Sequence, residues 1–229
     1  MKQHDPVMEL VDVGLTYRER HSLFRHTQFT ALEHIDLTIH AGETLGVIGS
    51  NGSGKSTLLR VMAAIYKPDT GRVIRHCNSV SLMSLGLGFD PQLSGVDNAI
   101  ILGMLLGSRK SQVLARLDQI IEFSELGQFI NEPIKTYSTG MRARLGFSVA
   151  VTMHADMLLI DEVLSVGDAG FRRKAEQTMQ ELIGSDQTVV LVTHSIPQVR
   201  KLCNRVLWLK EGKIFRLGET NEVVDEYGD

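Results

Sequence analysis

The chain of 229 residues has only two cysteines, Cys77 and Cys203, which lie far apart and show no C-x-x-C spacing. This scarcity argues against a disulfide framework and against a cysteine-based zinc site, and it fits a reducing compartment. Long hydrophobic runs are missing as well. The longest, residues 99–107, falls well short of the ~18 apolar residues that a membrane-spanning helix needs. We therefore expect a chain that is neither exported nor itself transmembrane.

An excess of charge of one sign is also missing. The 24 Lys and Arg residues nearly balance the 27 Asp and Glu residues, which leaves a net charge of −3. No global basic field exists of the kind that drives sequence-independent binding to nucleic acid, so a DNA clamp is not expected. The length suffices for one substantial α/β domain or for two small lobes that share a core.

The hydrophobic pattern predicts strands and helices in alternation. Strands are expected at residues 7–17, 33–39, 43–48, 72–74, 157–160, 188–193, 205–209 and 213–217. Helices are expected at residues 57–66, 171–183 and 196–202, and a helical lobe from about residue 97 to 155. Residues 18–30, which are rich in Arg and His, are expected to form an irregular loop.

The segment between the strand at 43–48 and the helix at 57–66 matches the P-loop pattern, G-x-x-x-x-G-K-S. Its glycines let backbone N–H groups converge on phosphate oxygens at the positive end of the helix. We expect Lys55 to reach the β- and γ-phosphates of ATP and the Ser56 hydroxyl to bind Mg²⁺. An ordinary glycine-rich turn is the alternative. The candidate nucleotide-binding residues are Gly49, Ser50, Asn51, Gly52, Ser53, Gly54, Lys55, Ser56 and Thr57.

Two adjacent acids, Asp161 and Glu162, follow the apolar strand at 157–160, at the end where α/β sheets place their ligands. Neighbouring strand residues point to opposite faces. Asp161 is therefore expected to hold the metal, while Glu162 is expected to act as general base on the attacking water. The alternative is that these acids only solvate the end of a strand.

A second anion site is predicted at the pentapeptide Tyr-Ser-Thr-Gly-Met of residues 137–141, which precedes a helical stretch. Small residues at a helix entrance leave N–H donors open, and the helix dipole favours an anion there. A capped helix without any ligand is the competing interpretation.

Taken together, these segments resemble the ATP-binding cassette family over nearly the whole chain. The hallmark pentapeptide of that family is Leu-Ser-Gly-Gly-Gln. Ser138 and Gly140 match the positions that touch the γ-phosphate of ATP held by the other subunit, whereas Thr139 and Met141 depart from the hallmark. This variant, with Ile-Lys-Thr just before it, is similar to the subgroup that exports polysaccharides.

The resemblance also implies roles for three isolated residues. Tyr17 matches the aromatic residue that stacks on adenine, and His194 matches the histidine that contacts the γ-phosphate. Residues 165–168 are similar to the loop that crosses the dimer interface, in which Asp168 is the matching position. Packing, a structural histidine and a simple turn are the respective alternatives.

One position departs from the family pattern. The family usually places a glutamine between its two lobes, where this chain has Ser84 or Leu85, and Gln92 follows several residues later. Neither Ser84 nor Leu85 can replace a glutamine, so no site residue is assigned there. Residues 85–89 of this chain read Leu-Gly-Leu-Gly-Phe, and polysaccharide exporters share a similar Leu-Gly-x-Gly-Phe segment.

The fold implied by the resemblance is a single α/β domain over residues 1–229, a P-loop ATPase core of the cassette type with a mostly parallel sheet. Residues 7–83 and 156–229 are expected to form this core together with an N-terminal antiparallel β subdomain, and residues from about 97 to 155 the helical lobe. Two copies are expected to close head to tail around ATP and Mg²⁺.

The function implied is that of the ATPase subunit of an exporter for a polysaccharide or a lipid-linked glycan such as O-antigen. A separate transmembrane permease would hold it at the cytoplasmic face of the inner membrane, with contacts near residues 89–99. An exporter of a drug, peptide or lipoprotein is the first alternative. A soluble cassette ATPase acting on DNA or ribosomes is the second, and the lack of a heptad run or basic stripe argues against it.

Overall fold

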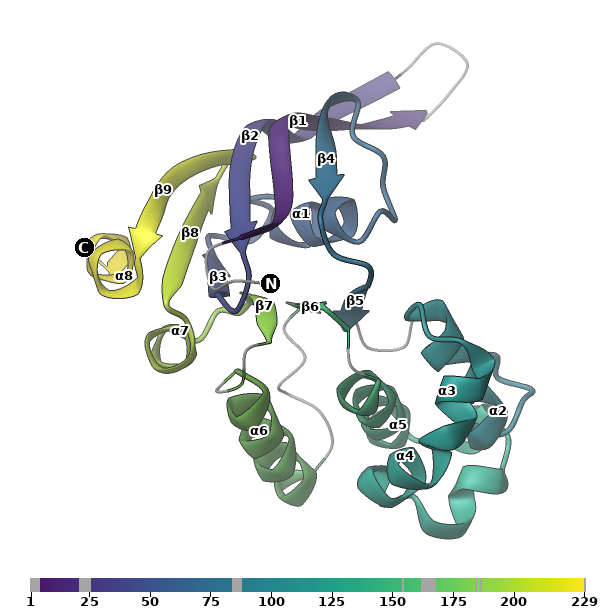
Figure 1. Ribbon diagram of the computed structural model, residues 1–229. Coiled ribbons are helices and arrows are strands. Elements are labelled where there is room, and N and C mark those ends of the chain that lie inside the picture. Colours follow the sequence, from purple (N-terminus) through teal and green to yellow (C-terminus); the bar gives the residue numbers. More distant parts are fainter. Residues whose placement is uncertain are drawn as a thin grey trace. The chain divides into compact units, whose positions relative to one another are not determined.

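The computed structural model describes residues 5–20, 26–83, 88–153, 155–161, 168–183, 185 and 187–228. The chain forms two compact units (Figure 1). The first unit comprises Met1–Asn78 and Asp186–Asp229, and the second comprises Ser79–Ser185. The expected division of the domain into a core and a helical lobe stays a prediction.

An antiparallel sheet of order β2-β1-β4 forms one part of the first unit. Its strands are β1 (Pro6–Arg20), β2 (His26–His40) and β4 (Thr70–Arg75). The alternating apolar residues of β1 are buried, among them Met8, Leu10 and Val13. Both long strands bulge at a residue with positive φ, Asp12 in β1 and His34 in β2.

The expected loop at residues 18–30 is wrong at both of its ends. β1 continues to Arg20 and β2 begins at His26, so that Arg18 pairs with Gln28 and Arg20 with His26. Backbone pairing extends the hairpin here without apolar alternation, and alternation was the only strand signal that the sequence offered.

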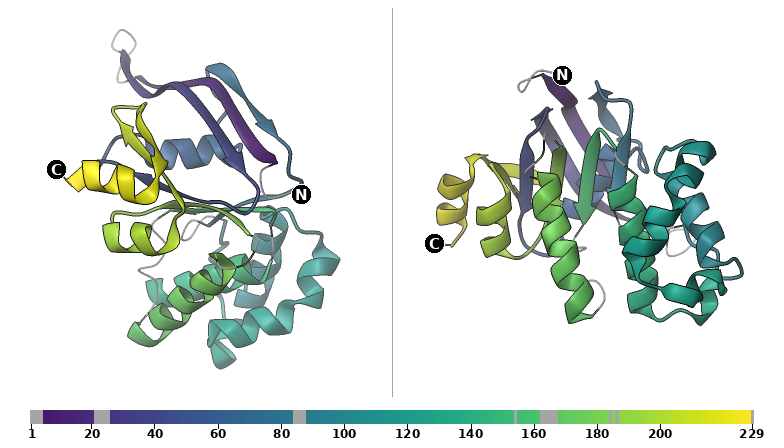
Figure 2. Two further views of the ribbon diagram at one scale, coloured as in Figure 1. Left: turned by 60° about the vertical axis from the view of Figure 1, so that its left-hand side comes forward. Right: turned by 60° about the horizontal axis from the view of Figure 1, so that its bottom comes forward.

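Parallel strands form the other part of the first unit. β3 (Thr44–Ile48) lies between β7 (Thr188–Val192) and β8 (Arg205–Lys210) and is parallel to both, while β9 (Lys213–Glu219) pairs antiparallel with β8. β3 and β7 are buried along their whole length, as continuous apolar runs predict. The helices are α1 (Lys55–Met62), α7 (Ile196–Leu202) and α8 (Thr220–Gly228); α7 and α8 lie side by side next to β8 and β9 (Figure 2).

The second unit combines a pair of parallel strands, β5 (Val80–Met83) and β6 (Met157–Asp161), with a set of helices. The helices are α2 (Gly95–Leu105), α3 (Lys110–Ala115), α4 (Leu117–Ser124), η1 (Gly127–Asn131), η2 (Ile134–Thr136), α5 (Thr139–Thr152) and α6 (Ala169–Ile183). Apolar residues of α2 to α5 pack into one core, which includes Ile120, Leu145 and Val149. Strand β5 and helix α8 were not expected from the sequence.

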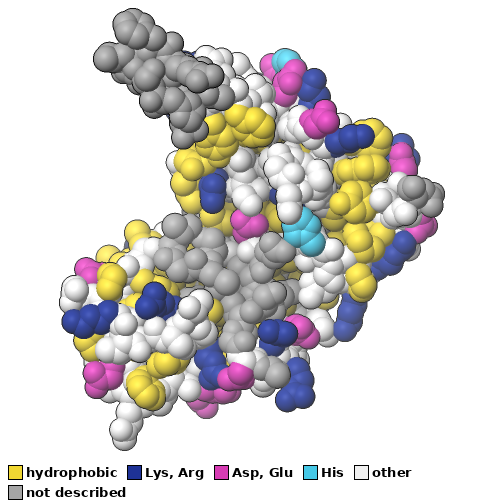
Figure 3. Space-filling view, turned by 180° about the vertical axis from the view of Figure 1, so that it is seen from behind, with side chains coloured by type: hydrophobic (Ala, Val, Ile, Leu, Met, Phe, Trp, Pro, Cys, Tyr) yellow, Lys and Arg dark blue, Asp and Glu magenta, His cyan; other side chains and the backbone are white. Residues whose placement is uncertain are grey.

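The distribution of charged side chains and the apolarity of the helices agree with what the composition predicts. On the face seen in Figure 3, the acidic and basic side chains that the structure describes are interspersed rather than gathered by sign. Within the described part of the chain, no helix combines the length and the apolarity that crossing a membrane requires.

Candidate nucleotide-binding site

The P-loop connects the end of β3 at Ile48 to the start of α1 at Lys55. Gly49 and Gly54 have φ of 148° and 105°, values that side-chain-bearing residues rarely adopt. A Cβ atom on Gly49 would lie 2.2 Å from the Leu209 carbonyl oxygen, and one on Gly54 would lie 2.4 Å from the Ala31 carbonyl oxygen. Glycine is therefore required at both positions for steric reasons.

Lys55 lies against the loop and is only 7% exposed. Its Nζ donates to the carbonyl oxygens of Gly49 and Ser50, at 2.8 Å each. The ammonium group is thus held inside the curve of the loop, where it would meet the charge of a phosphate.

Two further features of the loop suit an anion. The Ser53 side chain is 2% exposed, and its Oγ has no hydrogen-bond partner among the described residues. No described side chain caps α1, whose N-cap is Gly54, and the start of a helix favours an anion through its N–H groups and its dipole. Ser56, the expected Mg²⁺ ligand, lies partly exposed in that turn.

Tyr17 is anchored to the same helix. Its hydroxyl lies 3.0 Å from the Thr57 Oγ1, so the two groups share a hydrogen bond. Its ring meets Tyr66 edge to face, with the centroids 5.9 Å apart. Tyr17, which belongs to β1 of the same unit, therefore lies beside the start of α1. Its side chain is partly exposed, which leaves part of the ring accessible.

His194 and the P-loop follow the carboxyl ends of adjacent parallel strands, because β7 pairs with β3 and Val192 lies beside Val47. His194 is exposed at the turn that leads into α7. The turn is fixed by Thr193, whose Oγ1 accepts from the Ser195 N–H at 3.1 Å and donates to Gln198 Oε1 at 3.1 Å. Ligands of parallel α/β sheets bind at this edge.

The carboxylate pair falls in the second unit. Asp161 is the last residue of β6 and is partly buried. Glu162, the expected general base, lies outside the described residues, as do residues 165–167 of the expected interface loop.

Ser138 is the N-cap of α5, and its Oγ accepts a hydrogen bond from the Met141 N–H at 3.2 Å. The side chain is exposed, and its hydroxyl proton can still be donated while the oxygen accepts. Beneath it, Tyr137 is buried and donates from Oη to the Phe129 carbonyl at 2.6 Å. Burial raises the pKa of Tyr137 above its ordinary value. Gly140 lies in the first turn of the same helix.

Asp168 caps α6: its Oδ1 accepts from the N–H groups of Phe171 at 3.0 Å and Gly170 at 2.9 Å. Its carboxylate also pairs with Arg144 of α5. The backbone N–H of Phe171 first, and the Arg144 charge in addition, lower the pKa of Asp168 against a smaller opposing effect of desolvation. Arg144 had not been predicted, and a pair 24 residues apart leaves no local signal in the sequence.

The geometry described so far defines a class, an α/β protein with a preformed P-loop. The ABC transporter family matches residues 32–165. The chain is 46% identical over 198 residues to the O-antigen export system ATP-binding protein RfbB of Myxococcus xanthus, a match that covers 86% of this chain and 45% of that relative. It thus spans less than half of the Myxococcus protein.

Other relatives match over more of their own length. RfbB of Klebsiella pneumoniae is 41% identical over 205 residues, which cover 90% of this chain and 83% of the relative. The teichoic acids export ATP-binding protein TagH of Staphylococcus epidermidis is 40% identical over 203 residues, which cover 89% and 76%. The chain therefore belongs to the ABC transporter family, and the expected enzyme class, an ATPase of the cassette type, is confirmed.

Solved structures agree on the fold. The chain is similar to the ATP-binding cassette MJ0796, solved as a dimer with ADP and Pi, with a TM-score of 0.75 and 24% identity over 93% of this chain and 98% of that chain. An ATP-binding subunit of an ABC transporter matches with a TM-score of 0.78 and 18% identity, covering 97% and 93%. The expected α/β cassette fold, with mostly parallel strands, an antiparallel N-terminal sheet and helices, is confirmed.

Proposed function

We propose that this chain is the ATP-hydrolysing subunit of an exporter that moves a polysaccharide or a lipid-linked glycan. The observation that carries the ATPase part is the preformed phosphate loop, in which two glycines are required for steric reasons and Lys55 is held by two carbonyl groups. The glycan part is supported by relatives at 40–46% identity that are named for O-antigen and teichoic acid export.

The nucleotide is proposed to bind along the first unit. The N–H groups of the loop and Lys55 hold its phosphates, and Tyr17 stacks on the adenine from its place beside Thr57. The hydroxyl of Ser56 and the carboxylate of Asp161 are hard oxygen ligands of the kind that suit Mg²⁺. When bound, Mg²⁺ would neutralise phosphate charge.

Hydrolysis requires a water molecule in line with the γ-phosphate and compensation for charge that develops in the transition state. We propose that Glu162 orients and deprotonates this water, while Lys55 and His194 stabilise the charge on the phosphoryl oxygens. The placement of His194 beside the loop, after the neighbouring parallel strand, supports this role.

A second copy of the chain is proposed to complete each site. Ser138 and Gly140 lie at the exposed start of α5, where a hydroxyl and helix N–H groups can meet a phosphate, and Asp168 would lie at the same interface. A separate permease is proposed to receive the resulting movement through residues 89–99, which places the chain on the cytoplasmic face of the inner membrane.

The decisive test uses Glu162→Gln, with the exposed Glu122→Gln as matched control. The variant is expected to bind ATP, to hydrolyse it very slowly and to accumulate as a dimer in size-exclusion chromatography with light scattering, whereas the control should behave as the parent. A Glu162→Gln protein that is saturated with ATP and strictly monomeric would refute the shared site.

The transport part has its own test. The tagged chain, purified from membranes of its host, should bring with it a permease subunit and a glycan that mass spectrometry can identify. Recovery of the permease with a bound drug, peptide or lipoprotein instead would overturn the glycan assignment and leave the ATPase proposal intact.

A further inference from the structure

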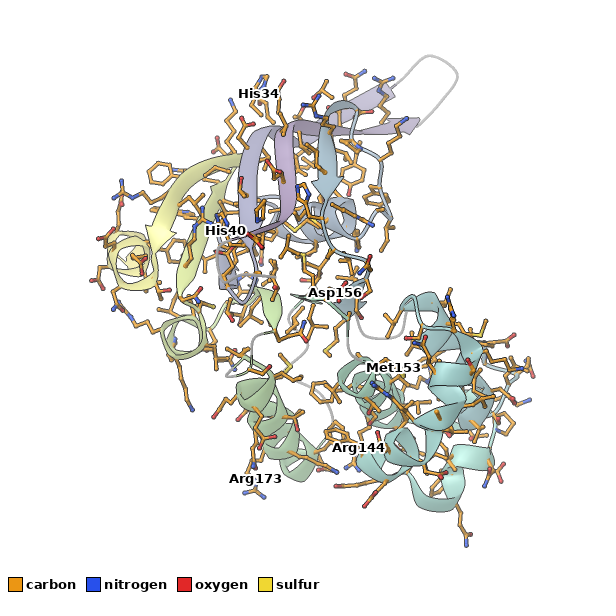
Figure 4. The ribbon with its side chains drawn as sticks, viewed as in Figure 1. His34, His40, Arg144, Met153, Asp156 and Arg173 are labelled. Carbon is orange, nitrogen blue, oxygen red and sulfur yellow. The ribbon has the colours of Figure 1, made fainter. Side chains whose placement is uncertain are left out.

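Arg144 lies at the centre of a contact network inside the second unit. It belongs to α5, six residues after the Ser138 cap, and its side chain is 17% exposed. Figure 4 labels Arg144 among the side chains of the second unit. Its guanidinium pairs with the carboxylate of Asp168, the residue that caps α6. It also lies over the Phe171 ring, 5.1 Å from the centroid. One side chain thus connects the helix that begins at Ser138 with the start of the next helix.

The same network reaches α4 through Glu125. Glu125 Oε2 lies 3.9 Å from Arg144 Nη1, and Glu125 Oε1 accepts from Lys174 Nζ at 2.6 Å. Lys174 also donates to the Phe123 carbonyl at 3.0 Å. The rings of Phe123, Phe147 and Phe171 pack against one another with centroids 5.9–6.0 Å apart. The network therefore contains two cationic and two anionic side chains, and both cations lie over aromatic rings.

The chemistry of this position suits arginine. A planar guanidinium can pair with two carboxylates and stack on a ring at once, whereas a lysine ammonium is a single strongly hydrated point charge. The Arg144 side chain is 17% exposed and the Asp168 side chain 63%, so solvent still screens the pair, and its contribution is to orient the two side chains. Both carboxylate oxygens of Asp168 accept hydrogen bonds, Oδ1 from two backbone N–H groups and Oδ2 from Arg144, and these three bonds orient the side chain.

We propose that Arg144 is a positioning residue, which holds Ser138 and Asp168 in one arrangement so that both meet the second copy together. The inference rests on the proposed function, because it assumes that these two residues face a partner. Arg144 touches no nucleotide in this scheme. It acts by keeping the first turn of α5 and the cap of α6 from moving independently.

The test is carried out in the Glu162→Gln background, in which ATP-dependent dimerisation can be measured by analytical ultracentrifugation. Arg144→Met should weaken the dimer about tenfold, the scale of a coupling of about 1.4 kcal/mol between directly contacting residues. ATP binding to the monomer, measured with a fluorescent nucleotide, should not change. With Glu162 intact, kcat should fall and KM for ATP should stay the same. Arg144→Lys should recover part of the loss.

Two comparisons separate positioning from mere stabilisation. The double variant Asp168→Asn with Arg144→Met should dimerise no more weakly than the worse of the two single variants, because both substitutions remove the same interaction. Lys174→Met breaks the other half of the network without touching Asp168, so it should lower the thermal midpoint and leave dimerisation unchanged. Arg173→Met, an exposed arginine of α6, controls for the loss of charge.

The inference is overturned if Arg144→Met dimerises as tightly as its background, if the effects of Arg144 and Asp168 simply add, or if Lys174→Met weakens the dimer as much. Should Glu162→Gln with Arg144 intact fail to dimerise on ATP, the shared site itself is wrong and the positioning role is wrong with it. If Arg144→Met does not fold, Arg144→Lys and the comparison with Lys174→Met decide the question.

Discussion

The substitution Asn98→Asp, which replaces a buried amide by a carboxylate, should destabilise the turn at the start of α2. Asn98 is fully buried, and its Nδ2 donates to the carbonyls of Asp90 at 3.0 Å, Leu93 at 3.1 Å and Ser94 at 2.8 Å, while its Oδ1 accepts from the Asp90 N–H at 2.7 Å. Asn98→Asp keeps the shape and the accepted N–H but turns an oxygen towards three carbonyl oxygens. Losing three neutral hydrogen bonds costs about 3 kcal/mol, before any repulsion.

The assay is urea unfolding at neutral pH, followed by far-ultraviolet circular dichroism. A loss of about 3 kcal/mol in the free energy of unfolding should lower the urea midpoint of the second unit by about 1–2 M. Asn131→Asp makes the same chemical change at an exposed residue of η1 and should leave the midpoint unchanged. Equal midpoints for both variants would refute the reasoning, since it assigns the cost to the three facing carbonyls and not to the added charge.

Three further outcomes follow from the contacts described above. Gly49→Ala should abolish ATP binding in calorimetry because its methyl group would lie 2.2 Å from a carbonyl oxygen, whereas Gly52→Ala, with nothing within 4 Å, should retain binding and cost only about 1 kcal/mol for its positive φ. Burial raises the pKa of Cys203 to about 12, so iodoacetamide should label Cys77 in the native protein and Cys203 only in urea, as peptide mass mapping would show. The folded-state pKa of Asp168 lies below its ordinary value of 3.8, so its carboxylate stabilises the fold above that value; the difference in thermal midpoint between the parent and Asp168→Asn should be full at neutral pH and disappear as the pH falls through the lowered pKa.

What the sequence predicted well is contiguous in the chain. The P-loop was predicted because its glycines, Lys55 and Ser56 follow one another within a few residues, between a strand and a helix that have strong periodic signals. The buried strands β3 and β7 were predicted for the same reason, since both are continuous apolar runs. Helix α7 was predicted with its observed bounds.

What the sequence could not predict depends on contacts between distant residues. The bond between Tyr17 and Thr57 joins residues 40 apart, and the pair between Arg144 and Asp168 joins residues 24 apart. No periodicity or local motif encodes either of them. Asn98 belongs with them, because it follows Asp97 at the start of α2, just before the apolar run of residues 99–107, where a polar residue is ordinary. Its burial and its four hydrogen bonds are visible only in the structure.

The departures from the family's hallmark pentapeptide have a physical explanation in the packing beneath it. Tyr137 replaces a leucine, and its hydroxyl occupies the space beside residue 95, where a Cβ would lie only 2.2 Å from Oη. Tyr137 therefore requires glycine at residue 95, where a Cβ would also lie 2.8 Å from the Ile130 carbonyl oxygen. Met141 packs against the helical core, while Ser138 and Thr139 remain exposed. Because Tyr137 and Met141 face inward, the variant changes how the turn is anchored and leaves Ser138 exposed at the start of α5, where the proposed contact with a phosphate would form.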